Sequence, residues 1–142
     1  MITLEASVVI DKPVEDVYEF VADPTNDPQW HTDIIDVRMP AGGDVEVGTV
    51  FTVVVKFMGR RTGTVEISDL QPGRLIEYTT KDGTIRPIAR CLMEPIDGGT
   101  RFTRHVEIPR EGFLRVVGPA IRGTAQRRQE RFAHNLKQLL ES

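Results

Sequence analysis

The chain has 142 residues, of which 39% are hydrophobic and 27% charged. It therefore has the size and composition of one globular domain, which excludes an intrinsically disordered chain as the default expectation. Its single cysteine, Cys91, excludes an internal disulfide and a thiolate-based zinc site, and no apolar run approaches the roughly 20 residues that cross a membrane. The net charge of −3 is uneven, because residues 1–50 hold eleven of the 21 acidic side chains and only two basic ones.

The first part of the chain predicts one strand and two short helical segments. Residues 2–10 are rich in β-branched side chains, which is typical of a strand. After Pro13, apolar residues recur at i, i+3, i+4 and i+7, and this spacing predicts an amphipathic helix over residues 14–21. Residues 24–30 contain two prolines and predict one more short turn or helix.

From Ile34 the pattern is that of an antiparallel meander, with turn signals between short β-rich runs. The predicted strands are 34–39, 49–58, 61–70, 75–81, 85–94 and 100–108. Pro87 indicates an edge position or a bulge near the start of strand 85–94. Asp97-Gly98-Gly99 is a strong hairpin signal between the last two strands.

The C-terminal pattern is helical and opens at Gly118-Pro119. It runs to about Glu141, and Ile121, Ala125 and Phe132 belong to one apolar stripe that faces a core. Seven antiparallel strands and one striped helix predict an α+β fold in which a curved sheet wraps around the long C-terminal helix. The imperfect fit between a curved sheet and a straight helix predicts an apolar cavity between them.

Several short stretches together resemble the SRPBCC (START-like, helix-grip) superfamily in its polyketide cyclase/dehydrase-like branch. They are Asp11–Tyr18, Ala22-Asp23-Pro24, Pro28-Gln29-Trp30-His31, Gly48-Thr49, Pro72-Gly73-Arg74-Leu75, Glu94–Arg101 and the C-terminal helix. The resemblance covers residues 1–142 as a single domain and implies a hydrophobic pocket between the sheet and the last helix. Members include lipid carriers, hormone receptors and aromatic polyketide cyclases, with no universal catalytic motif that maps onto this chain.

Strand periodicity selects the candidate pocket residues. Side chains that alternate onto the inner face, or lie on the helix stripe, are predicted to contact a ligand. They are Phe51, Val53, Val55, Tyr78, Arg90, Leu92, Phe102, Arg104, Ile121, Ala125 and Arg128. Trp30 is added because the resemblance implies that the segment after the second short helix lies near one end of the cavity. The placement of Arg90 and Leu92 depends on a register in which paired positions of the last two strands sum to 194.

Three arginines interrupt these otherwise apolar faces. Arg90, Arg104 and Arg128 either hold an anionic or carbonyl-bearing ligand, or pair with Glu66, Glu77 or Glu107, or extend to solvent at the cavity mouth. A register slip of one residue would turn Arg90 and Arg104 to solvent.

The remaining polar candidates are weaker. Tyr78 is interpreted either as a donor to a ligand carbonyl or as a core aromatic, and Trp30 either as a ligand-facing lid or, preferably, as a plug between helices and sheet. His31 is a candidate acid or base, with a partly exposed capping role preferred. The three histidines lie on different elements without ligand spacing, so we expect no metal and no cofactor.

Two functions follow as hypotheses. The first is a non-catalytic binder of a small hydrophobic molecule such as a lipid, an aromatic polyketide or another natural product. The second is a cyclase or dehydratase, in which Arg104 or Arg90 polarises a carbonyl and Tyr78 or His31 moves a proton. Its weakness is that no acidic residue is predicted to face inward. A protein-interaction scaffold is a lower alternative.

The expected partner is therefore a small hydrophobic ligand, in a cytoplasmic protein without a signal peptide or membrane span. A homodimer is left open. The arginine-rich C-terminal helix is interpreted as a complement to the acidic first fifty residues rather than a nucleic-acid surface. The segment Phe113–Val117 is interpreted as packing on the sheet, with a small amphipathic membrane contact as the alternative.

Overall fold

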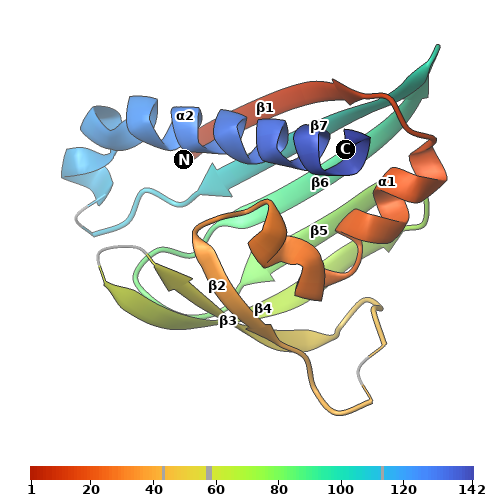
Figure 1. Ribbon diagram of the computed structural model, residues 1–142. Coiled ribbons are helices and arrows are strands. Elements are labelled where there is room, and N and C mark those ends of the chain that lie inside the picture. The colour runs from red at the N-terminus through yellow and green to blue at the C-terminus, as the bar shows by residue number, and fades with distance from the viewer. Residues whose placement is uncertain (43, 57–58, 113) are drawn as a thin grey trace.

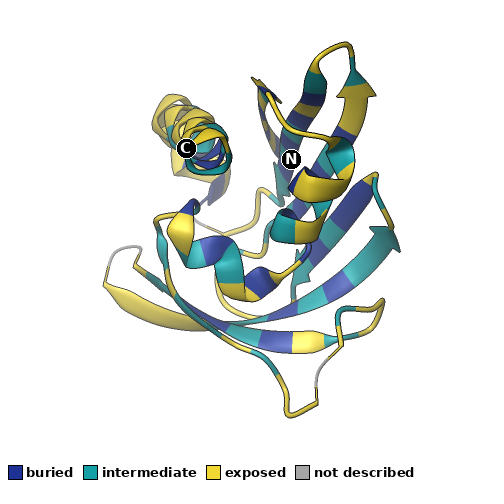
Figure 2. Ribbon diagram, turned by 45° about the vertical axis from the view of Figure 1, so that its right-hand side comes forward, coloured by how far each residue is buried: buried dark blue, intermediate teal, exposed yellow. Residues whose placement is uncertain are grey.

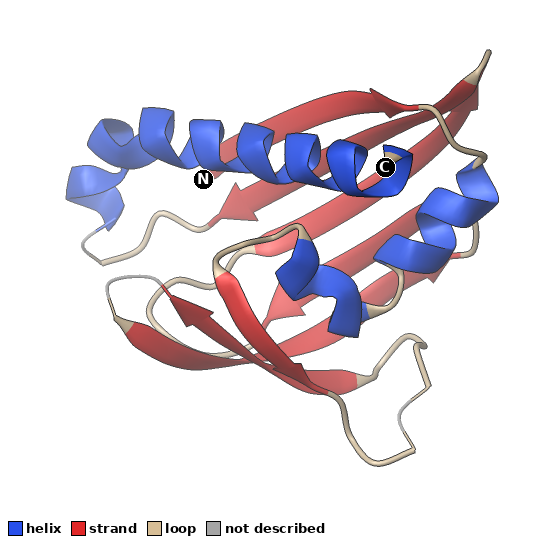
Figure 3. Cartoon of the chain, viewed as in Figure 1, coloured by secondary structure: helices blue, strands red, loops and turns tan. Residues whose placement is uncertain are grey.

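The computed structural model describes residues 1–42, 44–56, 59–112 and 114–142, and these form one seven-stranded antiparallel sheet with three helical segments (Figures 1 and 3). The elements are β1 (Ile2–Ile10), α1 (Val14–Val21), η1 (Pro24–Gln29), β2 (Ile34–Arg38), β3 (Val50–Lys56), β4 (Arg60–Gln71), β5 (Leu75–Thr80), β6 (Ile88–Ile96), β7 (Gly99–Ile108) and α2 (Leu114–Glu141). This confirms the predicted fold class. The end of the strand predicted at 49–58, Phe57 and Met58, lies outside the described residues.

The strand order β1-β7-β6-β5-β4-β3-β2 places the first two strands at opposite edges of the sheet. The connection between them, α1 and η1, crosses the same face that α2 covers (Figure 1). Figure 2 shows the sheet curving around these three segments, and buried residues alternate along β1 and β7. The main core cluster includes Val17 of α1, Phe102 of β7 and Phe132 of α2. The sheet, α1 and α2 therefore share one hydrophobic core.

The two N-terminal helical segments form where local chemistry favours them. In α1, Val17 and Val21 are buried, and Glu15 and Asp16 lie in the first turn beside the positive end of the helix. In η1, the Asp23 carboxylate accepts hydrogen bonds from the Thr25 amide and hydroxyl at 3.1 and 2.6 Å, which caps the turn.

Helix α2 begins at Leu114, four residues before the predicted start at Gly118-Pro119. Pro119 lies inside the helix, where it removes the amide that would otherwise bind the carbonyl of Arg115. The Arg110 guanidinium donates to that carbonyl at 3.2 Å instead. The predicted start was wrong because a side chain outside the helix satisfies the carbonyl that the proline leaves open.

The hairpin between β6 and β7 was predicted one residue out of register. Ile96 pairs with Gly99 across the two-residue turn Asp97-Gly98, so paired positions sum to 195 rather than 194. Strand β6 also begins at Ile88, after Pro87, rather than at Ile85. Because side chains alternate between faces, this single step exchanges the inner and outer residues of β6.

Helix α2 covers the free edge of β1 with side-chain hydrogen bonds. The Gln126 amide donates to the carbonyl of Glu5 at 2.6 Å and accepts from its amide at 3.2 Å. Arg122 donates to the carbonyl of Thr3 at 3.3 Å, and Lys137 donates to that of Val9 at 2.5 Å. All three β1 residues are odd-numbered, as expected for backbone groups that point away from the antiparallel partner β7. The helix thus satisfies an edge strand that would otherwise stay open.

Gly99 provides a stability test of the close approach between the β6–β7 hairpin and the end of β1. A Cβ at Gly99 would lie 2.3 Å from the carbonyl oxygen of Ile10, whereas one at Gly98 would meet nothing within 4 Å. We expect Gly99→Ala to lower the free energy of unfolding by about 3 kcal/mol, through overpacking. Gly98→Ala should cost about 1 kcal/mol, the strain of a positive φ. Chemical denaturation measures both, and equal losses would contradict the steric account.

Candidate functional site

Most predicted pocket residues lie in the interior between the sheet and the helices. Phe51, Val53, Tyr78 and Phe102 belong to the buried cluster that contains Phe132 of α2, and Val55 packs against it half-buried. Trp30, only 1% exposed, fills the space beside η1, with its ring 5.8 Å from that of Phe102 in an edge-on arrangement. This position fits the preferred interpretation of Trp30 as a plug.

Two predicted residues of β6 face the other way. Arg90 lies opposite His105 and Glu77, and its Nε donates to the Glu77 carboxylate at 2.5 Å. Leu92 lies opposite Thr103 rather than Phe102. The expectation that Arg90 and Leu92 line the interior was wrong because of the one-residue register step described above.

Cys91 and Met93 take their places on the inner face, both buried. Cys91 pairs with Arg104 in the β6–β7 ladder, and Met93 pairs with Phe102. Burial raises the pKa of the Cys91 thiol to about 11. The thiol therefore stays protonated at neutral pH and packs as an apolar side chain rather than acting as a nucleophile.

Arg104 is the buried cation of the interior, at 8% exposure. Its Nε donates to Oε1 of Gln129 on α2 at 2.8 Å, and its Nη1 lies 3.9 Å from the Cys91 sulfur. The guanidinium carbon sits 5.6 Å from the centre of the Trp30 ring, within cation–π range. Among the described residues no carboxylate forms an ion pair with Arg104, so its charge is held by neutral partners.

The turn at η1 presents three polar side chains beside Arg104. Asp27, Trp30 and His31 stand at i, i+3 and i+4, and the amides of Trp30 and His31 both donate to the Asp27 carbonyl, at 3.1 and 2.8 Å. Within the described part of the chain, Asp27 Oδ1, Trp30 Nε1 and His31 Nδ1 are buried and make no hydrogen bond of normal geometry, although the Trp30 indole is close enough to the Asp27 carboxyl to lower its pKa. Buried polar atoms are rarely left unpaired, so three on one turn mark a place where a further polar group fits.

The interior shifts the protonation of these groups. Burial raises the pKa of Asp27 to about 8, against the opposing pull of the Arg104 charge. Burial and Arg104 hold the pKa of His31 well below its ordinary range, and its ring stacks on Phe132 at 4.1 Å. At neutral pH both side chains are therefore mainly uncharged beside a permanent cation.

Tyr78 faces the same interior from β5. Its hydroxyl donates to the carbonyl of Val21 at 3.4 Å, and its ring packs edge-on against Phe51 at 5.9 Å. Burial raises the pKa of Tyr78 well above its ordinary value, so the hydroxyl keeps its proton. It serves as a core aromatic with a weakly engaged hydroxyl.

The predicted ligand-binding residues of α2 differ in how far they are buried. Arg128 pairs with Asp33, and the Asn135 amide donates to the Trp30 carbonyl at 3.2 Å, so α2 is tied to the segment after η1. Ala125 is half-buried against a second core cluster, but Ile121 is 38% exposed. The predicted buried stripe is therefore wrong at Ile121, although Leu114 and Gly118 of the same half of α2 are buried.

Sequence reasoning missed Asp27 and Gln129. The missing inward-facing acid is Asp27, which comes from a short turn rather than from a strand, so strand parity could not find it. The available signal was the spacing Asp27-x-x-Trp30-His31, which places all three on one side of a helical turn.

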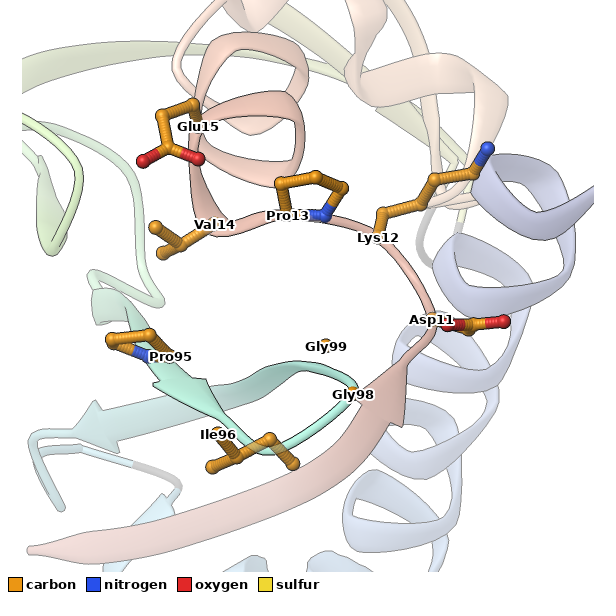
Figure 4. Close-up of a pocket in the computed structure, with 9 residues that line it drawn as sticks. All are labelled: Asp11, Lys12, Pro13, Val14, Glu15, Pro95, Ile96, Gly98 and Gly99. Atoms are coloured by element: carbon orange, nitrogen blue, oxygen red, sulfur yellow. The ribbon is translucent and has the colours of Figure 1, made fainter.

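A separate surface pocket of about 480 Å³ opens between the start of α1 and the β6–β7 hairpin (Figure 4). Figure 4 shows Pro13, Val14, Pro95 and Ile96 around the hollow, while the Asp11 side chain points away from it. The Lys12 carbonyl at its rim accepts from the Thr100 hydroxyl at 2.8 Å. The pocket contains none of the predicted ligand-binding residues.

The described helices include none that is both long enough and apolar enough to span a membrane. The family described as polyketide cyclase/dehydrase and lipid transport matches residues 1–141. No curated protein sequence matches the chain significantly.

Solved structures share the fold over nearly the whole chain. A START superfamily protein from Mycobacterium smegmatis has a TM-score of 0.79 at 18% identity, covering 98% of this chain and 97% of its own. A protein from Thermus thermophilus has a TM-score of 0.80 at 15% identity, with 97% and 96% covered. The di-domain ARO/CYC protein BexL of the BE-7585A biosynthetic pathway has a TM-score of 0.75 at 16% identity, covering all of this chain and 48% of its own. At these identities the likeness shows the fold alone.

The protonation of Asp27 makes stability depend on pH. Its pKa is 3.8 in the ordinary case and about 8 when folded, so between these values the folded state holds one more proton than the unfolded state. Stability contributed by this group is present at low pH and is lost as pH rises through that window. We expect the unfolding free energy of wild type, relative to Asp27→Asn, to fall by up to about 1 kcal/mol per pH unit. Parallel pH curves for the two proteins would contradict this, and Asp44→Asn on the surface is the matched control.

Proposed function

The chain belongs to the polyketide cyclase/dehydrase and lipid transport family, and from that membership we propose that it binds a small hydrophobic molecule between the sheet and α2. The ligand is a lipid, an aromatic polyketide or another natural product that carries at least one oxygen. The apolar walls from β3, β5 and β7 take up its hydrocarbon part, and the turn at η1 with Arg104 takes its oxygen.

The observation that carries this proposal is the group of unpaired polar atoms inside an apolar core. Arg104 is held by Gln129 and Cys91 without a carboxylate in the described residues, and Asp27 Oδ1, Trp30 Nε1 and His31 Nδ1 make no hydrogen bond of normal geometry there. A buried polar atom left without a well-formed hydrogen bond costs about 1 to 3 kcal/mol. A ligand oxygen that accepts from Arg104 or from the Trp30 indole removes part of this cost, whereas a hydrocarbon does not.

Ligand entry requires α2 to separate from the segment after η1. The two are joined by the Arg128–Asp33 ion pair and by the Asn135–Trp30 carbonyl hydrogen bond. Polar contacts of this kind exchange readily with water, so the buried stacking of His31 on Phe132, at 4.1 Å, is the apolar contact that opening at this point must also break. We therefore place the opening at residues 30–33 and the adjoining turn of α2.

A catalytic role of the cyclase or dehydratase type is the second candidate, and Asp27 is the observation that favours it. Its carboxylate form can take a proton from the carbon beside a ligand carbonyl, while Arg104 stabilises the enolate oxygen that forms. The C–H bond breaks, the proton moves to the carboxylate, and the electron pair moves to oxygen. This pairing supplies the inward-facing acid that sequence patterns did not predict.

A pair of naphthalene probes tests the polar anchor. We expect wild type to bind 2-acetylnaphthalene about tenfold or more tightly than 2-ethylnaphthalene, because only the ketone accepts a hydrogen bond from Arg104. Quenching of Trp30, the one tryptophan of the chain, reports both titrations. Arg104→Met should abolish the preference, whereas Arg101→Met, on the outer face of β7, should retain it. Equal affinities in wild type would refute the anchor, and no binding of either probe would refute the interior site.

The same ketone tests the catalytic alternative. If Asp27 transfers protons, wild type in heavy water should exchange the methyl hydrogens of 2-acetylnaphthalene for deuterium faster than buffer does. The rate should rise with pH as the carboxyl, with a pKa of about 8, ionises. Asp27→Asn should lose the acceleration, as followed by proton NMR. Exchange at the buffer rate in wild type would leave binding as the function and remove catalysis.

A further inference from the structure

The first half of α2 differs in charge from the rest of the molecule. Residues 112–129 contain four arginines and no acidic residue, in a chain whose net charge is −3. Arg115, Arg122 and Arg127 of this segment are exposed, whereas Arg128 pairs with Asp33. The segment thus presents a concentrated positive charge at one end of the molecule, where α2 begins (Figure 1).

Apolar side chains are exposed on the same half of the helix. Val116 is 82% exposed, and Val117 and Ile121 are 36% and 38% exposed. Figure 2 shows this helix as mainly exposed, in contrast to the strands that it covers. Helical spacing puts Val116 and Arg127 on the same side of the helix, the side that faces away from the sheet. An outward apolar residue flanked by arginines is the pattern of a helix that lies on a membrane surface.

A pocket of about 260 Å³ lies beside this half-helix, lined by Met1, Ile2, Arg110, Gly118, Pro119 and Arg122. Each of the two arginines donates one hydrogen bond to a backbone carbonyl. Arg110 donates to the carbonyl of Arg115 at 3.2 Å, and Arg122 donates to the carbonyl of Thr3 at 3.3 Å. The absent side chain of Gly118 helps to keep the helix close to β1, because a Cβ there would lie 2.9 Å from Cδ1 of Ile2. Two oriented guanidiniums in an apolar hollow suit a phosphate group.

Acidic groups near this end are already paired. Glu111 binds Arg86 at 3.0 Å, and Glu107 lies 3.1 Å from His105. Both acids are therefore partly neutralised by their own partners. The field in front of Arg110 and Arg122 stays positive.

We propose that this end of the molecule docks on a bilayer that contains anionic phospholipid, with a headgroup phosphate between Arg110 and Arg122 and Val116 in the interfacial layer. The proposal does not depend on what the interior binds. Each arginine adds a modest attraction to an anionic membrane, so the set gives reversible rather than permanent attachment, weakened by salt. A nucleic acid is less favoured, because the exposed valines and Met1 would gain nothing from a phosphate backbone.

The test is co-sedimentation of the full chain with vesicles. We expect binding at low salt to vesicles of equal parts phosphatidylglycerol and phosphatidylcholine, at least about tenfold tighter than to pure phosphatidylcholine, and lost at high salt. Val116→Asp and Arg122→Gln should each weaken binding severalfold, while Arg122→Lys should retain part of it. The matched controls are Val47→Asp, at a site 59% exposed in the β2–β3 connection, and Arg38→Gln on β2. Both should bind as wild type does.

Several outcomes would overturn the proposal. They are equal binding to both vesicle types, no sedimentation with either, or an equal loss in the control variants. Inorganic phosphate that raises the thermal midpoint, together with unchanged vesicle binding by Val116→Asp, would indicate a soluble phosphate site instead. Tighter binding to a DNA duplex than to vesicles would assign a different partner. Thermal melting of each variant checks that a loss of binding is not a loss of fold.

Discussion

The arrangement of this molecule depends on how α2 covers the open edge of β1. An edge strand leaves every second backbone amide and carbonyl unpaired, and such an edge invites association with other chains. Here the helix supplies Arg122, Gln126 and Lys137 to the odd-numbered residues of β1, and Glu141 accepts from the Asp11 amide at 2.9 Å. These bonds are spaced along the whole strand. They fix the helix both in rotation and in its position along the strand.

The position of the helix decides what enters the interior. With Gln126 held at Glu5, Gln129 comes within 2.8 Å of Arg104, and Phe132 comes into contact with His31. A guanidinium buried without any partner would be strongly unfavourable, so the Gln129 oxygen and the Trp30 ring make its position tolerable. The same partners leave the cation without a counter-charge. This combination of a held but unneutralised charge in an apolar space suits recognition of a ligand oxygen better than it suits stability.

The two halves of α2 therefore have different physical roles. The second half contributes Phe132, Ala133 and Leu136 to the core and carries the contacts to the segment after η1. The first half is held to β1 by Arg122, by Gln126 and by the close approach of Gly118, and it leaves Val116, Val117 and most of its arginines exposed. Burial of Asp27, Trp30 and Arg104 makes the interior selective. Exposure of Val116 and Arg127 makes the outer end of the helix available to a surface.

The sequence by itself determined the element order, the curved sheet around a C-terminal helix, and the inward direction of Arg104 and Phe102, because hydrophobic periodicity depends only on local spacing. It did not determine the faces of Arg90 and Leu92, since a two-residue turn instead of a longer one shifts the ladder by one residue and inverts the strand. Tertiary structure also decided the start of α2, where Arg110 satisfies the carbonyl that Pro119 leaves open. It brought Asp27 to Arg104 as well, through a turn whose side chains follow no strand parity. In each case the deciding contact lies outside the run of residues whose spacing made the prediction, and local spacing carries no information about such contacts.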